Sequence, residues 1–177
     1  GGNWTYDNPD TIWGDGRFYR LTGRGYDSVG NPPGTPDEMS GIQASFTYDI
    51  TQPTSTVVNL TEGAYYLNPT VLSGTAVDLK PGRVGTVRVQ IRDLSVSECW
   101  HDVGGWTASC GSSDYNDADP PSPPSDNGNL NQHNWSYTIP GGINWSVRDG
   151  AKFAVRVKAQ DLASNWEMGE AIVSSRT

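Results

Sequence analysis

Apolar and polar residues alternate along several short stretches of this chain. The clearest is 85–94, where Val87, Val89 and Ile91 face one way and Arg88, Gln90 and Arg92 face the other. This period of two predicts strands with one side against a core. The other predicted strands are 3–6, 17–25, 43–50, 57–60, 65–67, 71–77, 134–139, 151–159 and 171–175, with a hairpin over 96–110. No long stretch keeps a helical apolar stripe, so the pattern predicts an all-β sandwich with essentially no helix.

One phrase of the sequence occurs twice. Asn134-Trp135-Ser136-Tyr137, Asp149-Gly150 and Asp161-Leu162-Ala163-Ser164-Asn165 repeat Asn3-Trp4-Thr5-Tyr6, Asp15-Gly16 and Asp27-Ser28-Val29-Gly30-Asn31. The differences 149 − 15 and 161 − 27 are both 134. In 177 residues, such a period predicts more than one copy of a unit and fewer than two.

The repeat divides the chain into three predicted parts. Residues 1–50 are the last strands of an incomplete repeat, and residues 57–177 form a nearly complete sandwich. Between them, 51–56 contains one proline and no apolar side chain, which predicts a stiff, extended linker.

Several phrases resemble the bacterial immunoglobulin-like repeats of large secreted and cell-surface proteins. They are Pro-Thr-Ser-Thr-Val, Gly-Ala-Tyr-Tyr-Leu-Asn, Leu-Ser-Gly-Thr-Ala-Val-Asp, Val-Arg-Val-Gln-Ile-Arg-Asp-Leu, Asn-Trp-Ser-Tyr-Thr-Ile-Pro and Lys-Ala-Gln-Asp-Leu-Ala-Ser-Asn. The resemblance implies an Ig-like antiparallel β-sandwich and a stalk, adhesin or filament component. The family's final motif usually reads Asp-x-Ala-Gly-Asn, and Ser164 departs from it, so the two copies need not make the same turn.

Charge, hydropathy and glycosylation sequons argue against several classes of function and favour others. The net charge of −8 argues against nucleic acid and against electrostatic docking on an anionic membrane. No apolar run approaches the length that a membrane helix needs. Asn-x-Ser/Thr sequons at Asn3, Asn59, Asn134 and Asn144 are glycosylation candidates that favour an extracellular protein, although Asn134 also suits the start of a strand.

The two cysteines, Cys99 and Cys110, flank Gly104-Gly105. A two-residue hairpin turn at these glycines would place the cysteines directly opposite each other, since 99 + 110 and 104 + 105 are equal. This spacing predicts a cross-strand disulfide, which is typical of extracytoplasmic proteins.

Two groups of oxygen-bearing side chains are candidate calcium ligands. Asp114, Asn116, Asp117 and Asp119 form an acidic loop, and Asp27 and Asn31 follow a strand end near the junction of the two repeats. Both groups have a plainer interpretation as solvated turns, in which Asp and Asn accept backbone hydrogen bonds. Calcium is therefore the only cofactor that the sequence suggests.

Trp100 and Trp106 are candidate rings for stacking on a glycan, and packing over the sandwich is the alternative. Catalysis has little support, because His101 and His133 are the only histidines and no nucleophile, zinc or phosphate-loop motif is present. We therefore expect no enzyme. The alternative to a structural repeat is a carbohydrate-binding module of a secreted enzyme.

The incomplete first repeat raises the question of partners. Residues 1–50 supply only the last strands of a sandwich, which leaves unpaired edges and an apolar face. Either upstream sequence completes this unit, or another chain supplies the missing strands and builds a filament by strand exchange. The expected partners are thus neighbouring copies of the same repeat.

Overall fold

The computed structural model describes residues 5, 7, 12–23, 29, 43–108, 110–111, 114–119, 121–123, 125–141, 143–169 and 171–176. These residues form antiparallel strands and one short 3-10 turn, η2 (Trp145–Arg148). The chain divides into two compact units, unit 1 (Gly1–Ile50) and unit 2 (Thr51–Thr177). Within the described residues there is no helix with the length and hydropathy that crossing a bilayer requires.

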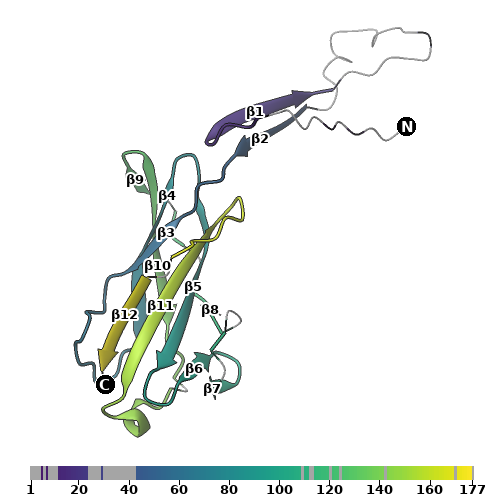
Figure 1. Ribbon diagram of the computed structural model, residues 1–177. Helices are drawn as coiled ribbons and strands as arrows, with labels where there is room; N and C mark the ends of the chain where they lie inside the picture. Colours follow the sequence, from purple (N-terminus) through teal and green to yellow (C-terminus); the bar gives the residue numbers. More distant parts are fainter. Residues whose placement is uncertain are drawn as a thin grey trace. The chain divides into compact units, whose positions relative to one another are not determined.

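Unit 2 is an Ig-like β-sandwich of two antiparallel sheets (Figure 1). The smaller sheet has the order β3 (Thr54–Val57), β4 (Val71–Leu79), β10 (Leu130–Thr138) and β9 (Ser125–Asn127). The larger sheet has the order β12 (Ala171–Arg176), β11 (Lys152–Asp161), β5 (Val84–Asp93), β6 (Glu98–His101) and β7 (Gly105–Thr107). A further short strand, β8 (Asn116–Asp117), pairs with β5. The all-β prediction is confirmed.

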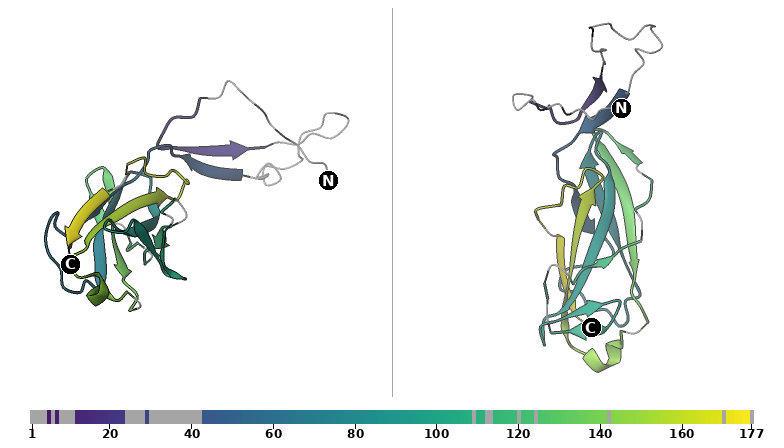
Figure 2. Two further views of the ribbon diagram at one scale, coloured as in Figure 1. Left: turned by 60° about the horizontal axis from the view of Figure 1, so that its bottom comes forward. Right: turned by 90° about the vertical axis from the view of Figure 1, so that its right-hand side faces the viewer.

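The core lies between the sheets because alternate residues of each strand point inward. Val87, Val89 and Ile91 of β5 are at most 1% exposed, as their alternation predicted. Trp135 and Tyr137 of β10 supply large rings from the opposite sheet, at 2% and 3% exposure. The 3-10 turn and the β6–β7 hairpin lie at one end of the sandwich (Figure 2).

The predicted linker over 51–56 is wrong for its second half. Thr54–Val57 is strand β3, which pairs with β4, and both Pro53 and Ser55 are buried. Ser55 tolerates burial because Glu167 accepts hydrogen bonds from its backbone N–H at 2.9 Å and from its hydroxyl at 2.6 Å. Ser55 points inward, and its polar groups bond to the Glu167 carboxylate. An apolar side chain is therefore not needed at this position.

Other strand boundaries also differ from the prediction. The predicted strand over 57–60 ends at Val57, the last residue of β3, and only an isolated bridge at Tyr65 occurs within 65–67. β10 begins at Leu130, four residues before the predicted start at 134. Its first half carries polar residues such as the buried His133, so no apolar alternation marks it in the sequence. Gln90 was expected on the solvent side of β5, yet it is 2% exposed and donates to the Gly111 carbonyl at 3.2 Å. The loop after β7 therefore covers part of the outer face of the larger sheet.

The described residues of unit 1 include a two-stranded antiparallel sheet, β1 (Arg17–Thr22) paired with β2 (Gln43–Tyr48). One face carries an aromatic cluster of Trp13, Tyr19 and Phe46, with ring centroids 4.7–5.5 Å apart. Trp13 meets Tyr19 edge-on at 81°, and in unit 2 Trp145 meets Phe153 edge-on at 80°. Tyr19 and Phe153 are 134 residues apart, so the sequence repeat is also a repeat of local geometry. The predicted strand over 3–6 lies almost wholly outside the described residues.

Candidate functional site

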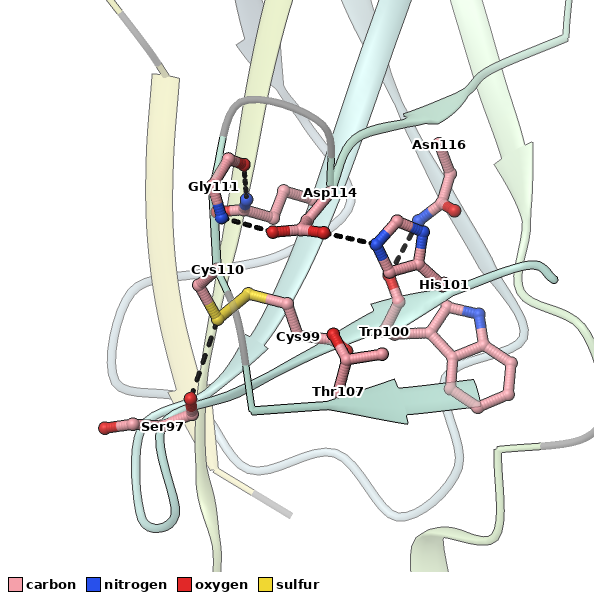
Figure 3. The surroundings of a disulfide bond; sticks show 10 residues. Ser97, Cys99, Trp100, His101, Thr107, Cys110, Gly111, Asp114 and Asn116 are labelled. Carbon is pink, nitrogen blue, oxygen red and sulfur yellow. Dashed lines mark hydrogen bonds and ion pairs between the residues drawn. A yellow bond between two sulfur atoms is a disulfide. The ribbon is translucent and has the colours of Figure 1, made fainter. Parts of the chain in front are cut away.

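The loop that follows β7 is attached to the larger sheet by a disulfide. Cys99 of β6 bonds to Cys110, with their Cα atoms 5.4 Å apart (Figure 3). The predicted disulfide is confirmed, but the predicted register is wrong. Cys99 lies opposite Thr107, because the hairpin loop contains three residues (102–104) and Gly105 begins β7. Both glycines have positive φ, 113° and 78°, which suits a three-residue loop closed by a left-handed residue.

Polar contacts hold the rest of this loop against the sheet. Asp114 is 5% exposed, and its carboxylate accepts from the backbone N–H of Gly111 and from the ring of His101 (Figure 3). Asn116, also buried, donates to the Trp100 carbonyl and accepts from the Asp102 backbone, both at 3.0 Å. The loop is therefore closed by one covalent bond and several hydrogen bonds over the outer face of β5 and β6.

The predicted calcium ligands of this loop have separate protein partners. Beyond the contacts of Asp114 and Asn116, Asp117 pairs with Arg88 at 2.8 Å and Asp119 accepts from the Ser136 hydroxyl at 2.8 Å. These oxygens are directed at different neighbours, which argues against a shared ligand set. The second predicted group, Asp27 and Asn31, lies outside the described residues.

Two other carboxylates of unit 2 come closer together than the sequence suggested. Asp78 and Asp161 are 2% and 4% exposed, and an oxygen of each lies within 4.8 Å of the other. Buried carboxylates this close repel each other unless a proton or a cation lies near both. Among the described residues of unit 2, these two belong to a carboxylate group compact enough to hold a cation. The feature of the sequence that points to this pair is the repeated motif at 161–165, which begins with Asp161.

That motif makes a turn after β11. Asp161 accepts from the backbone N–H of Asn165 at 2.7 Å and from its side-chain amide at 2.8 Å. Ser164 has a φ of 75°, the left-handed conformation that glycine adopts at low cost. The turn of unit 2 therefore forms with serine at the position where the motif usually has glycine.

The two predicted glycan-stacking rings differ in exposure, and both have packing partners. Trp100 is 5% exposed and belongs to the core. Trp106 is half-buried, packs against Trp100 and Phe153, and has the Arg148 guanidinium 4.0 Å from its ring centroid. Neighbouring side chains thus pack against both rings, as in the packing alternative.

Arg148, which caps Trp106, also bridges two carboxylates. It donates to Asp93 at 2.6 Å and to Glu98 at 2.7 Å, and Asp93 is 2% exposed. Burial lowers the pKa of Arg148, but the hydrogen bonds and negative charges of Glu98 and Asp93 outweigh it, so the pKa is raised. This network joins η2 to β5 and β6 at one end of the sandwich.

The histidines and the sequon asparagines do not come together in one site among the described residues. Both described histidines are engaged: His101 with Asp114, and His133 through its Nδ1 with the Ser122 carbonyl at 2.7 Å, on a different sheet. Of the sequons, Asn59 bonds to the β4 backbone at Val71 and Ser73, Asn134 lies exposed in β10, and Asn144 is exposed before η2. Asn3 lies outside the described residues.

Removing the disulfide is expected to lower the free energy of unfolding by about 2–3 kcal/mol, because the closed loop is short. The change is the double substitution Cys99→Ser and Cys110→Ser, measured by urea denaturation with and without reductant. Reductant should destabilise the native chain by the same amount and leave the double variant unaffected. An equal effect of reductant on both chains would contradict the prediction.

Tyr137 gives unit 2 a dependence on alkaline pH. Its hydroxyl donates to Asp102, and burial, followed by this hydrogen bond and the Asp102 charge, raises the pKa of Tyr137 above its ordinary value of 10.0. The folded state therefore favours the protonated phenol. Its contribution to stability is fully present below pH 10.0 and is lost as the pH rises above it, when the unfolded chain ionises first.

The expected slope is about 1.4 kcal/mol per pH unit above the pKa of the unfolded chain. Urea denaturation from about pH 8 to about pH 11 measures it, and Tyr137→Phe should remove this part of the slope. Tyr48, on β2 of unit 1, supplies a matched control as Tyr48→Phe. Identical pH profiles for native and Tyr137→Phe chains would refute the assignment.

No family model matches the chain, and no curated protein matches it.

Proposed function

We propose that this chain is a segment of an extracellular, non-enzymatic tandem-repeat protein that acts as a structural stalk or adhesive spacer at a cell surface. The observation that carries the proposal is the repeated geometry of Trp13 on Tyr19 and Trp145 on Phe153, 134 residues apart for the second ring of each pair. Recurrence of the same ring packing beside a strand in both units is typical of an array of repeats.

The contacts within unit 2 support a load-bearing role. Its core is its own, since the buried apolar residues of β4, β5, β10 and β11 pack against each other. Glu167 connects the two sheets, because it accepts from Ser55 of β3 and from the Ala159 backbone of β11 at 3.0 Å. The disulfide and the sequons at Asn59, Asn134 and Asn144 favour an oxidising, extracellular location.

Structural contacts account for several ionisable groups of unit 2 without chemical activity. Asp114 fixes a loop, Asp93 and Glu98 hold Arg148, and His133 bonds to a backbone carbonyl. Each has a structural partner, which supports a scaffold more than a binding module. The carbohydrate-binding alternative is weakened because both of its candidate rings are packed.

Single-molecule pulling of the full chain between reference domains tests this proposal. A stalk segment should resist extension and then release unit 2 in one cooperative step, because load applied at its ends acts on strands held by the core and by Glu167. Smooth extension without a force peak would overturn the load-bearing role.

A glycan-binding measurement distinguishes a carbohydrate-binding module from a structural stalk. The full chain and a Trp106→Ala variant are compared on a glycan array, with Trp166→Ala as the control for loss of a half-buried tryptophan elsewhere. Binding that disappears only in Trp106→Ala would establish a carbohydrate-binding module in place of a stalk.

A further inference from the structure

The aromatic face of the sheet in unit 1 corresponds to the core-facing side of the larger sheet in unit 2. Strand register places Tyr19 opposite Phe46 and Leu21 opposite Ala44, all on one face with Trp13 packed over the rings. Tyr19 corresponds to Phe153 and Leu21 to Val155, each 134 residues later. Phe153 and Val155 are 3% and 4% exposed in unit 2, whereas Leu21 is 46% exposed.

Unit 2 shows what covers this face in a complete repeat. A small cavity of about 20 Å³ is lined by Trp145 and Phe153 together with Leu60, Leu72 and Ile91. These covering residues come from 57–94, the part of the repeat that precedes β10. In addition, β5 pairs with β11 from Phe153 to Asp161 on the edge away from β12. β1 pairs with β2 on one side, and no described strand of unit 1 lies on the other side, which corresponds to the edge that β5 occupies and is called here the open edge of β1.

The number of repeat parts in this sequence argues against a second copy of the same chain as the source of the covering segment. The chain carries the last part of the repeat twice, at 3–50 and 134–177, and the earlier part once, at 51–133. If 51–133 of one copy moved onto unit 1 of another, its own 134–177 would be left uncovered instead. Strand exchange among chains of this sequence therefore leaves as many incomplete units as before and gains no buried area.

We propose that the open edge of β1 and the aromatic face of unit 1 bind a polypeptide segment with the pattern of residues 57–94, contributed by a further repeat of the same type. The segment supplies a β5-like strand antiparallel to β1 and a β4-like strand that places apolar side chains over Tyr19 and Phe46. The inference rests on the proposed array function and names the partner of unit 1 within it.

A fusion tests this partner directly. A second copy of residues 51–133 is placed before Gly1 of the full chain, and amide hydrogen exchange is measured at 17–22 and 43–48. Covering the sheet should slow exchange at these amides by at least about 100-fold, towards the protection of β11 and β12. Unchanged exchange at β1 and β2 would overturn the proposal.

Matched variants of the fusion show whether the expected face is used. Leu72→Asp in the added copy should abolish the new protection, because Leu72 is 1% exposed in unit 2 and faces the cavity. Thr75→Asp in the added copy is the control, since Thr75 alternates with the buried positions of β4 and is half-buried. Protection that survives Leu72→Asp would show that the segment binds elsewhere.

The chain without the added copy provides the last part of the test. Its mass is measured by light scattering over a dilution series, with hydrogen exchange at the same amides. Protection of β1 and β2 that grows with concentration and mass would make a second copy the partner and overturn the assignment to a further repeat. The pulling experiment examines unit 2, so a failure here leaves the array function to be judged separately.

Discussion

Replacement of Arg148 by methionine is expected to lower the free energy of unfolding of unit 2 by about 3–5 kcal/mol. The substitution removes the cation that lies 2.6 Å from Asp93 and leaves a carboxylate with 2% exposure uncompensated. It also removes the guanidinium from the Trp106 ring. Methionine keeps most of the side-chain volume, so the loss reports the charge rather than a cavity. Urea denaturation at neutral pH measures it.

Two companion variants show which carboxylate matters. Adding Asp93→Asn to Arg148→Met should recover part of the lost stability, because a neutral amide does not leave a buried charge and still accepts from the Ser95 backbone. Glu98→Gln alone should cost at most about 1 kcal/mol, because that side chain is 32% exposed. A loss below about 1 kcal/mol for Arg148→Met would show that the network contributes little to folding.

Gly74→Ala is expected to destabilise unit 2 by about 3 kcal/mol, at the upper end for overpacking. A Cβ atom at this position would lie 1.8 Å from the Thr56 carbonyl oxygen and 2.6 Å from Cζ2 of Trp135. The carbonyl belongs to the backbone of β3, so relief requires β3 to move away from β4 and its hydrogen bonds to weaken. Denaturation gives the loss, and hydrogen exchange should be faster across β3.

Gly141→Ala is the matched control, because a Cβ atom there would meet no atom within 4 Å. It should change the stability by no more than about 0.5 kcal/mol. If Gly74→Ala were equally silent, the close approach of β3 and of the Trp135 ring to Gly74 would be wrong.

Period-two alternation was enough to predict the sandwich where the inward residues are hydrocarbon. β5 and β11 were found in this way, since Val87, Val89 and Ile91 or Val155 and Val157 recur on one side. Alternation gives no signal where a polar residue points inward and bonds to a partner that is distant in the sequence. Ser55 depends on Glu167, 112 residues away, and no local pattern indicates that contact.

The candidate site was less predictable for a related reason. Two adjacent glycines fit either a two-residue or a three-residue hairpin loop, and only the pairing of Cys99 with Thr107 distinguishes them. Acidic residues near 114–119 suggested a metal because side-chain direction is not visible in sequence, whereas the structure directs Asp114 to His101 and Asp117 to Arg88. The disulfide itself depended only on the proximity of two cysteines, and that could be predicted.

The Cys99–Cys110 bond has a consequence for damage to the molecule. The tip of the β6–β7 hairpin is fully open to attack, with Val103 93% exposed, and exposed loop tips are preferred sites of proteolysis. A cut at Val103 would sever the main chain, yet the residues before and after it would remain one covalent molecule through the two sulfurs. A protease can thus nick this repeat without dividing the protein that contains it.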